Sequence, residues 1–101
     1  MAIQRIVCFK FKADASSEAI AQHMQDFAGM KTAIPQIQEY RGGMTKPGDN
    51  NSAPEYDVMH YMVFASMEDI EIYRPHPAHQ AFIQRNKASW EKVLVLNSEI
   101  A

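Results

Sequence analysis

The sequence has little of what marks several large classes of protein. Its 101 residues include one cysteine, Cys8, which cannot form a disulfide within the chain. No apolar run approaches the ~20 residues of a membrane-spanning helix, and Arg5, Lys10 and Lys12 interrupt the N-terminal apolar stretch, unlike a signal peptide. The 10 Lys and Arg residues against 12 Asp and Glu leave a formal charge of -2, without the positive excess of a nucleic-acid binder. We therefore expect a cytoplasmic protein that binds neither membranes nor nucleic acid.

The sequence also lacks the common motifs of cofactor and metal enzymes. It contains no glycine-rich phosphate loop, no G-x-S-x-G and no dinucleotide-binding fingerprint. His76 and His79 are spaced like a helical metal pair, but Pro77 lies between them and no cysteine pair supplies further ligands. Cys8 lies within a predicted strand, where we expect a small buried apolar side chain and not a nucleophile. We expect no metal and no cofactor.

What the sequence does contain is the composition of one globular domain spanning residues 1–101, with 47% hydrophobic and 22% charged residues. Residues 3–12 alternate in polarity with a period of two, which predicts a strand. Further strands are predicted over residues 37–44, 56–64 and 93–96, and helices after the capping candidates Ser16 and Ser66 and from Pro77 to Trp90. Gly42 and Gly43 suggest a bulge or bend. This order predicts an α+β, ferredoxin-like fold: a four-stranded antiparallel sheet with helices on one face.

One predicted strand indicates that the chain has a partner. Within residues 56–64 both parities are largely apolar, because Met59, Tyr61 and Val63 alternate with the residues expected to face the helices. Helices on one side leave these three side chains exposed, and apolar patches of this kind usually mark interfaces. Packing two such sheets face to face buries them and closes a barrel across a two-fold axis. We therefore expect a homodimer in the form of a dimeric α/β barrel.

The segment Tyr73–Phe82, which reads YRPHPAHQAF, is distinctive. Together with residues 5–12, 34–37 and 90–95 it resembles the stress-responsive dimeric α/β-barrel family, also called the Dabb or A/B-barrel domain, over nearly the whole chain. The resemblance implies a ferredoxin-like fold paired as a dimeric barrel, in agreement with the pattern of the residues. It implies no single activity, since some members are known only as stress-induced proteins and others resemble cofactor-free cyclases that close a linear polyketide.

His79 and Tyr73 are the candidate catalytic residues. His79 is expected in the first turn of a helix, where the helix dipole disfavours imidazolium and leaves a neutral ring that can act as a general base. The phenol of Tyr73 can donate a hydrogen bond to a carbonyl or enolate oxygen. The resemblance to the cyclase-type members places their catalytic His and Tyr at these two positions. Both residues also have a structural interpretation, in which His79 bonds backbone or water and Tyr73 packs in the core.

Four further residues are candidates for binding a ligand. Arg5 stands where the cyclases have histidine; it cannot act as a base, but it can bind a carboxylate, pair with an acid or extend to water. His60 faces the same pocket or is a satisfied interior histidine, and Trp90 walls a cavity or belongs to the core. His76 either contacts a ligand or locks the helix N-terminus. His23 borders an apolar helical stripe, and we expect it at the boundary of the core.

These interpretations leave three functions open. The first is a small homodimeric stress-response A/B-barrel domain protein with a pocket for a keto or anionic small molecule and no settled reaction. The second is a cofactor-independent, polyketide cyclase-like enzyme with His79 as general base and Tyr73 as oxygen donor. The third is a non-catalytic structural or protein-binding dimer. An open cavity reached by Tyr73, His79 and Arg5 favours binding or catalysis, whereas a space filled by Trp90 and Phe27 favours the third.

Overall fold

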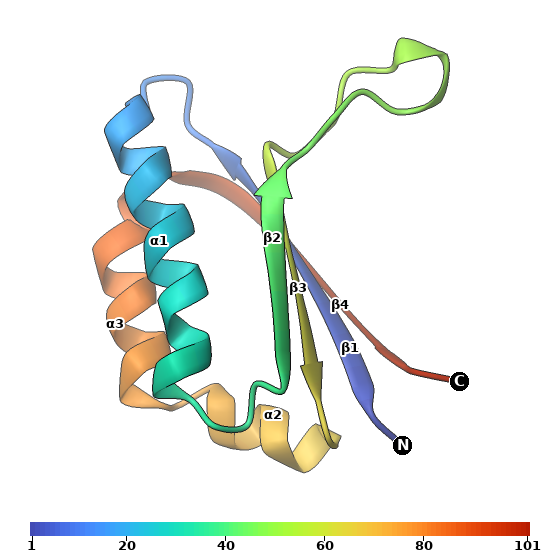
Figure 1. Ribbon diagram of the computed structural model, residues 1–101. Coiled ribbons are helices and arrows are strands. Elements are labelled where there is room, and N and C mark those ends of the chain that lie inside the picture. Colours follow the sequence, from blue (N-terminus) through green and yellow to red (C-terminus); the bar gives the residue numbers. More distant parts are fainter.

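Alternating side-chain polarity builds the sheet at the centre of the fold. The computed structural model describes all residues, 1–101. Its four strands are β1 (Ile3–Phe11), β2 (Glu39–Met44), β3 (Val58–Phe64) and β4 (Trp90–Glu99). They form one antiparallel sheet in the order β2-β3-β1-β4, and the helices lie on one side of it (Figure 1). This confirms the predicted α+β, ferredoxin-like arrangement.

Three helices form the second layer, and a side chain caps each of them. They are α1 (Ser17–Ala33), α2 (Met67–Tyr73) and α3 (Pro77–Asn86). The side chains of Ser16, Ser66 and His76 each accept a hydrogen bond from a first-turn N–H, a donor that the helix itself leaves free. Pro77 occupies the first turn of α3, where its missing N–H costs nothing. As predicted, α1 ends before Pro35.

The chain enters its last strand earlier than the sequence predicts. The prediction places Trp90 on the last helix and begins the strand at residue 93. Instead α3 ends at Asn86, and a short 3-10 turn, η2 (Lys87–Ser89), carries the chain into β4. Trp90 therefore pairs with Phe11 across the sheet. Strand pairing explains the difference, because β1 offers β4 partners along its whole length.

The sheet has one irregularity, and it is not where the sequence suggests a bulge. At Gly42 and Gly43, β2 keeps a continuous register with β3. The register shift falls between Lys10 and Phe11, where the end of β1 meets the start of β4. Gly42 therefore needs another explanation, which its surroundings supply.

The dry core lies between the helices and the sheet. Apolar side chains follow the helix-facing side of β1 and β3, and each such buried side chain contributes ~1.5–3 kcal/mol. The core cluster consists of Ile3, Val7, Phe9, Phe11, Phe27, Met30, Ile34, Ile37, Val58, Met62, Phe64, Ile70, Tyr73 and Phe82. Two polar residues, Arg5 and His60, are buried on the same rows. Because a buried polar group is costly without a partner, these two positions direct attention to the candidate site.

The opposite side of the sheet is apolar and uncovered. We call it the open face; its central side chains are Ile6, Cys8, Met59, Tyr61, Leu94 and Leu96, which the strand register brings together. Met59 is 48% and Leu96 is 56% exposed, whereas Val63, which the sequence predicts to be exposed on this face, is buried where β3 pairs with Gln4 and Glu39 of the neighbouring strands. The loop of residues 45–57 projects from the end of β2 away from the helices (Figure 1). None of the helices has the length and apolar character needed to cross a membrane.

Candidate functional site

The structure sorts the predicted site residues into two groups and one helix cap. Three of them meet where β1, α2 and α3 adjoin, and we call them the Arg5 cluster: Arg5, Tyr73 and His79. Two others, His60 and Trp90, lie in the core and are linked to each other through His23. His76 caps α3, with its Nδ1 accepting a hydrogen bond from the Ala78 N–H at 3.0 Å.

The Arg5 cluster is a stack of charged and aromatic groups. Tyr73, the last residue of α2, is 1% exposed. The His79 ring packs on the Tyr73 ring with 4.3 Å between their centres and 28° between their planes. The guanidinium carbon of Arg5 lies 5.6 Å from the centre of the Tyr73 ring. The first turn of α3 and the N-terminal half of β1 thus bring a base, a phenol and a cation together.

The backbone determines which nitrogen of His79 is free. Its Nδ1 lies 2.8 Å from the carbonyl oxygen of Arg74, which can only accept a hydrogen bond. The proton therefore resides on Nδ1, and the lone pair of the neutral ring resides on Nε2. Burial lowers the pKa of His79, more than the carbonyl of Arg74 raises it. At neutral pH the ring is therefore uncharged and presents an unprotonated Nε2, as a general base requires.

Tyr73 and Arg5 complement this base with hydrogen-bond donors. Burial raises the pKa of Tyr73 to about 12, although Arg5 opposes the rise, so the phenol keeps its proton. Burial likewise lowers the pKa of Arg5, but a guanidinium remains charged at neutral pH. A phenol and a cation beside a base form the set needed to remove a proton next to a carbonyl and to stabilise the resulting enolate oxygen.

Asn97 is a member of this site that sequence reasoning missed. It lies opposite Arg5 in the β1–β4 register, and its Oδ1 accepts a hydrogen bond of 3.0 Å from Arg5 Nη1. The sequence predicts that the last strand ends at residue 96, whereas β4 continues to Glu99. Asn97 becomes a candidate only once this longer strand and its register with β1 are known.

The second group is a hydrogen-bonded row through the core, which we call the histidine chain: Trp90, His23, His60 and Tyr40. Trp90 Nε1 donates to His23 Nδ1 at 3.0 Å, because an indole nitrogen can only donate. A neutral His23 therefore carries its proton on Nε2 and donates to His60 Nε2 at 3.0 Å. His60 in turn carries its proton on Nδ1 and donates to Tyr40 Oη at 2.8 Å. One donor at one end thus sets every tautomer in the row.

The histidine chain fills the space where the sequence left room for a cavity. Phe27 stacks on His60 with 3.7 Å between ring centres, and Trp90 packs on Phe9 at 4.6 Å. His23 is fully buried, which corrects its expected place at the core boundary. Burial lowers the pKa of His23 to about 4 and that of His60 to about 3, so both rings are neutral. His60 and Trp90 therefore take structural partners here and do not reach the Arg5 cluster.

Gly42 makes room for one end of the histidine chain. A side chain at Gly42 would overlap the Tyr40 hydroxyl and stand 3.0 Å from His60 Nδ1, whereas one at Gly43 would meet nothing within 4 Å. Gly42 thus allows Tyr40 to lie along its own strand and reach His60.

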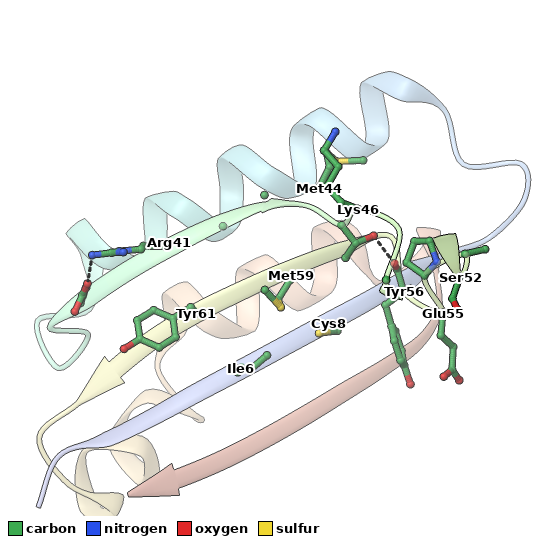
Figure 2. A pocket seen from close by; sticks show the side chains of 17 residues that line it. Ile6, Cys8, Arg41, Met44, Lys46, Ser52, Glu55, Tyr56, Met59 and Tyr61 are labelled. Carbon is green, nitrogen blue, oxygen red and sulfur yellow. Dashed lines mark hydrogen bonds and ion pairs between the residues drawn. The ribbon is translucent and has the colours of Figure 1, made fainter. Parts of the chain in front are cut away.

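A hollow of about 890 Å³ lies on the other side of the sheet (Figure 2). Ile6, Cys8, Met59 and Tyr61 line it from the open face, and the loop of residues 45–57 forms its wall. Lys92 on β4 ties this loop to the sheet, through an ion pair of 2.6 Å with Glu55 and a position 4.9 Å from the centre of the Tyr56 ring. The hollow therefore belongs to the uncovered face and not to the Arg5 cluster. No three His, Cys, Asp or Glu side chains gather closely enough to hold a metal ion.

Known proteins share this architecture. The family model described as "Stress responsive A/B Barrel Domain" matches residues 3–100. Olivetolic acid cyclase of Cannabis sativa is 25% identical over 97 residues, which cover 96% of this chain and 95% of that protein. A hydroxynitrile lyase from Passiflora edulis has a structure with a TM-score of 0.88 and 21% identity, covering 99% of this chain and 94% of that one. A dimeric ferredoxin-like protein of unknown function from Thermobifida fusca has a TM-score of 0.83 and 18% identity, over 99% and 92% of the two chains.

We predict that the histidine chain makes the protein less stable in mild acid. The folded protein keeps both rings neutral, with pKa values of about 4 for His23 and about 3 for His60, whereas the unfolded chain protonates histidine near pH 6.5. Below that pH the unfolded state binds more protons, so the free energy of unfolding falls as the pH drops toward the folded-state values. Urea titrations between about pH 7 and 5 should show a slope of a few kcal/mol per pH unit, to which the lowered pKa of His79 contributes in the same direction.

Two variants separate this effect from general acid sensitivity. His60→Leu removes one of the titrating rings, so its slope should be smaller than that of the wild type by roughly 1.4 kcal/mol per pH unit. Gln84→Ala changes an exposed, non-titrating side chain on α3 and should leave the slope unchanged. An undiminished slope in His60→Leu would contradict the assignment.

The tautomers of two neighbouring histidines should be opposite. In ¹⁵N NMR spectra at about pH 7, His79 should show a protonated Nδ1 and an unprotonated Nε2, because Nδ1 donates to the Arg74 carbonyl. His76 should show the reverse, because its Nδ1 accepts from the Ala78 N–H. The two rings are controls for each other in one spectrum, and a protonated Nε2 on neutral His79 would rule out the proposed base.

Proposed function

Because the chain belongs to the stress-responsive A/B-barrel domain family, we propose that it acts as a homodimeric A/B-barrel protein that binds a small molecule at the Arg5 cluster. The observation that carries the dimer is the apolar open face, which the helices of the same chain leave bare. A second copy facing it across a two-fold axis would bury about 800 Å² per partner, the usual size for a stable interface. The dimeric ferredoxin-like protein from Thermobifida fusca supports this pairing.

The ligand site lies at the edge of the helical layer, because the centre is filled. Aromatic rings and the histidine chain occupy the middle of the core. The Arg5 cluster lies outside this filled region and combines a cation, a phenol and a free imidazole nitrogen. These groups suit a keto or anionic small molecule.

A second candidate function is a cofactor-independent proton transfer on a keto compound. It is favoured by the lone pair on His79 Nε2, which no group within the chain uses, with the Tyr73 phenol as oxygen donor. Two similar proteins are named as a cyclase and a lyase, which supports an enzymatic use of the fold. Stress responses, which the family's description names, and a cytoplasmic location, which the sequence predicts, stay part of the proposal.

The homodimer predicts the effect of a charge on the open face. Sedimentation of the wild type at micromolar concentration should give a particle of about twice 11.5 kDa. Leu96→Lys should shift it toward the monomer, because a buried unpaired charge is costly at an interface. Ile72→Lys is the matched control, since Ile72 is similarly exposed but lies on α2. A wild-type particle of 11.5 kDa would exclude the dimer.

The proton-transfer hypothesis predicts a specific loss on replacing His79. A methyl ketone such as 2-butanone should exchange the protons beside its carbonyl for deuterium faster with the protein than in buffer, as followed by ¹H NMR in D₂O. His79→Gln should slow the catalysed exchange by roughly 10²–10⁴-fold with the fold intact. Tyr73→Phe should slow it less, because Arg5 remains beside the oxygen.

Gln84→Ala is the control for these variants, since Gln84 is exposed on α3. Exchange no faster than in buffer, or equal in wild type and His79→Gln, would dismiss the reaction and favour a non-catalytic dimer.

A further inference from the structure

Arg5 is a buried cation without an acidic partner. It is 7% exposed, yet its hydrogen-bond partners are neutral groups, the Asn97 amide and the Tyr73 phenol. Its Nε is buried with no partner at all. The other arginines lie near the surface, and each forms an ion pair with a carboxylate: Arg41 with Glu39, Arg74 with Glu71 and Arg85 with Asp26.

This arrangement is costly unless a further group supplies negative charge. Buried charges in proteins are normally paired, because removing an ion from water is expensive. A guanidinium has five N–H donors, and within the chain the Asn97 amide and the Tyr73 phenol engage at most two of them. A carboxylate is the group that matches its planar donors best, with two parallel hydrogen bonds.

An apolar strip leads from the surface to Arg5. Val93 and Val95 of β4 share the helix-facing side with Asn97, which lies opposite Arg5. They are 43% and 42% exposed, because the helical layer does not extend over this part of β4. On its other side the guanidinium lies over the Tyr73 ring, against which His79 packs. The cation of Arg5 therefore lies between the apolar side chains of β4 on one side and Tyr73 and His79 on the other.

We propose that the Arg5 cluster binds a small oxo-carboxylate, with its carboxylate on Arg5, its aliphatic part against Val95 and its carbonyl toward Tyr73 and His79. This names the ligand class of the proposed function and rests on it for the carbonyl end. Arg5 is then the residue that determines specificity for an anion.

The test compares two probes of similar shape and different charge, 4-oxopentanoate and the neutral ketone 5-methylhexan-2-one. Binding to the full chain is followed by the NMR signal of the Arg5 Nε–H group, which has no partner in the free protein. The keto acid should shift this signal saturably and bind at least ~10-fold more tightly than the ketone. Arg5→Met should remove that preference, Arg5→Lys should retain part of it, and Arg41→Met, which alters a surface arginine, should leave it unchanged.

The outcomes separate this inference from the proposed function. If the two probes bind equally, or if Arg5→Met keeps the preference, the carboxylate assignment is wrong, even where His79→Gln still abolishes exchange of a neutral ketone. If the keto acid binds through Arg5 and exchanges no protons, the assignment holds and the proton transfer fails. If Arg5→Met does not fold, the wild-type Nε–H signal and Arg5→Lys decide the question. If the Nε–H signal shifts with protein concentration and does not respond to the keto acid, an acidic residue of the second copy pairs with Arg5. That result overturns the proposal.

Discussion

A single layer of helices covers only the middle of the sheet, and this partial cover determines what each part of the molecule can do. Under the helices the core is dry and filled by rings such as Phe9 and Phe27. On the open face the apolar side chains have no cover of their own, which is the physical basis for pairing with a second copy. Beyond Trp90, the helix-facing side of β4 is also bare at Val93 and Val95, on the strand next to the buried Arg5. The proposed interface and the proposed ligand site both follow from this incomplete helical cover.

The two buried polar residues of the sheet, His60 and Arg5, differ in how many of their hydrogen-bonding groups have a partner. Both ring nitrogens of His60 are bonded, and the row that contains it runs from the Trp90 donor to the Tyr40 hydroxyl. Such a row offsets the cost of burying imidazoles, and it leaves no imidazole lone pair for a substrate. Arg5 has a buried Nε–H without a partner and no acidic group beside it. The difference is the reason for placing the proposed ligand at Arg5 and not at the histidine chain.

Much of this could be predicted from the sequence, and the exceptions share a cause. Period-two alternation placed the strands, and the segment Tyr73–Phe82 pointed to the family and to the two residues that meet Arg5. The histidine chain was missed because its members are 20 to 67 residues apart, and only the docking of α1 on the sheet brings them together. Trp90 was assigned to a helix because periodicity does not reveal a three-residue turn such as η2. Local sequence patterns predict where helices and strands lie. Contacts between distant elements can be predicted only when the strand register and the packing of the helices on the sheet are known.

The free nitrogen of His79 depends on the break between α2 and α3. In a continuous helix the carbonyl of Arg74 would accept the N–H of Ala78, four residues on. Pro75 and Pro77 interrupt the helix, and the Ala78 N–H is taken by His76 Nδ1. The carbonyl is therefore left for the His79 Nδ1–H, and the side-chain amide of Gln80 also donates to it. If the two helices were joined, the carbonyl would return to the backbone ladder and the imidazole would lose the contact that sets its tautomer. The capping histidine thus helps to position the candidate base by taking the Ala78 N–H away from the Arg74 carbonyl.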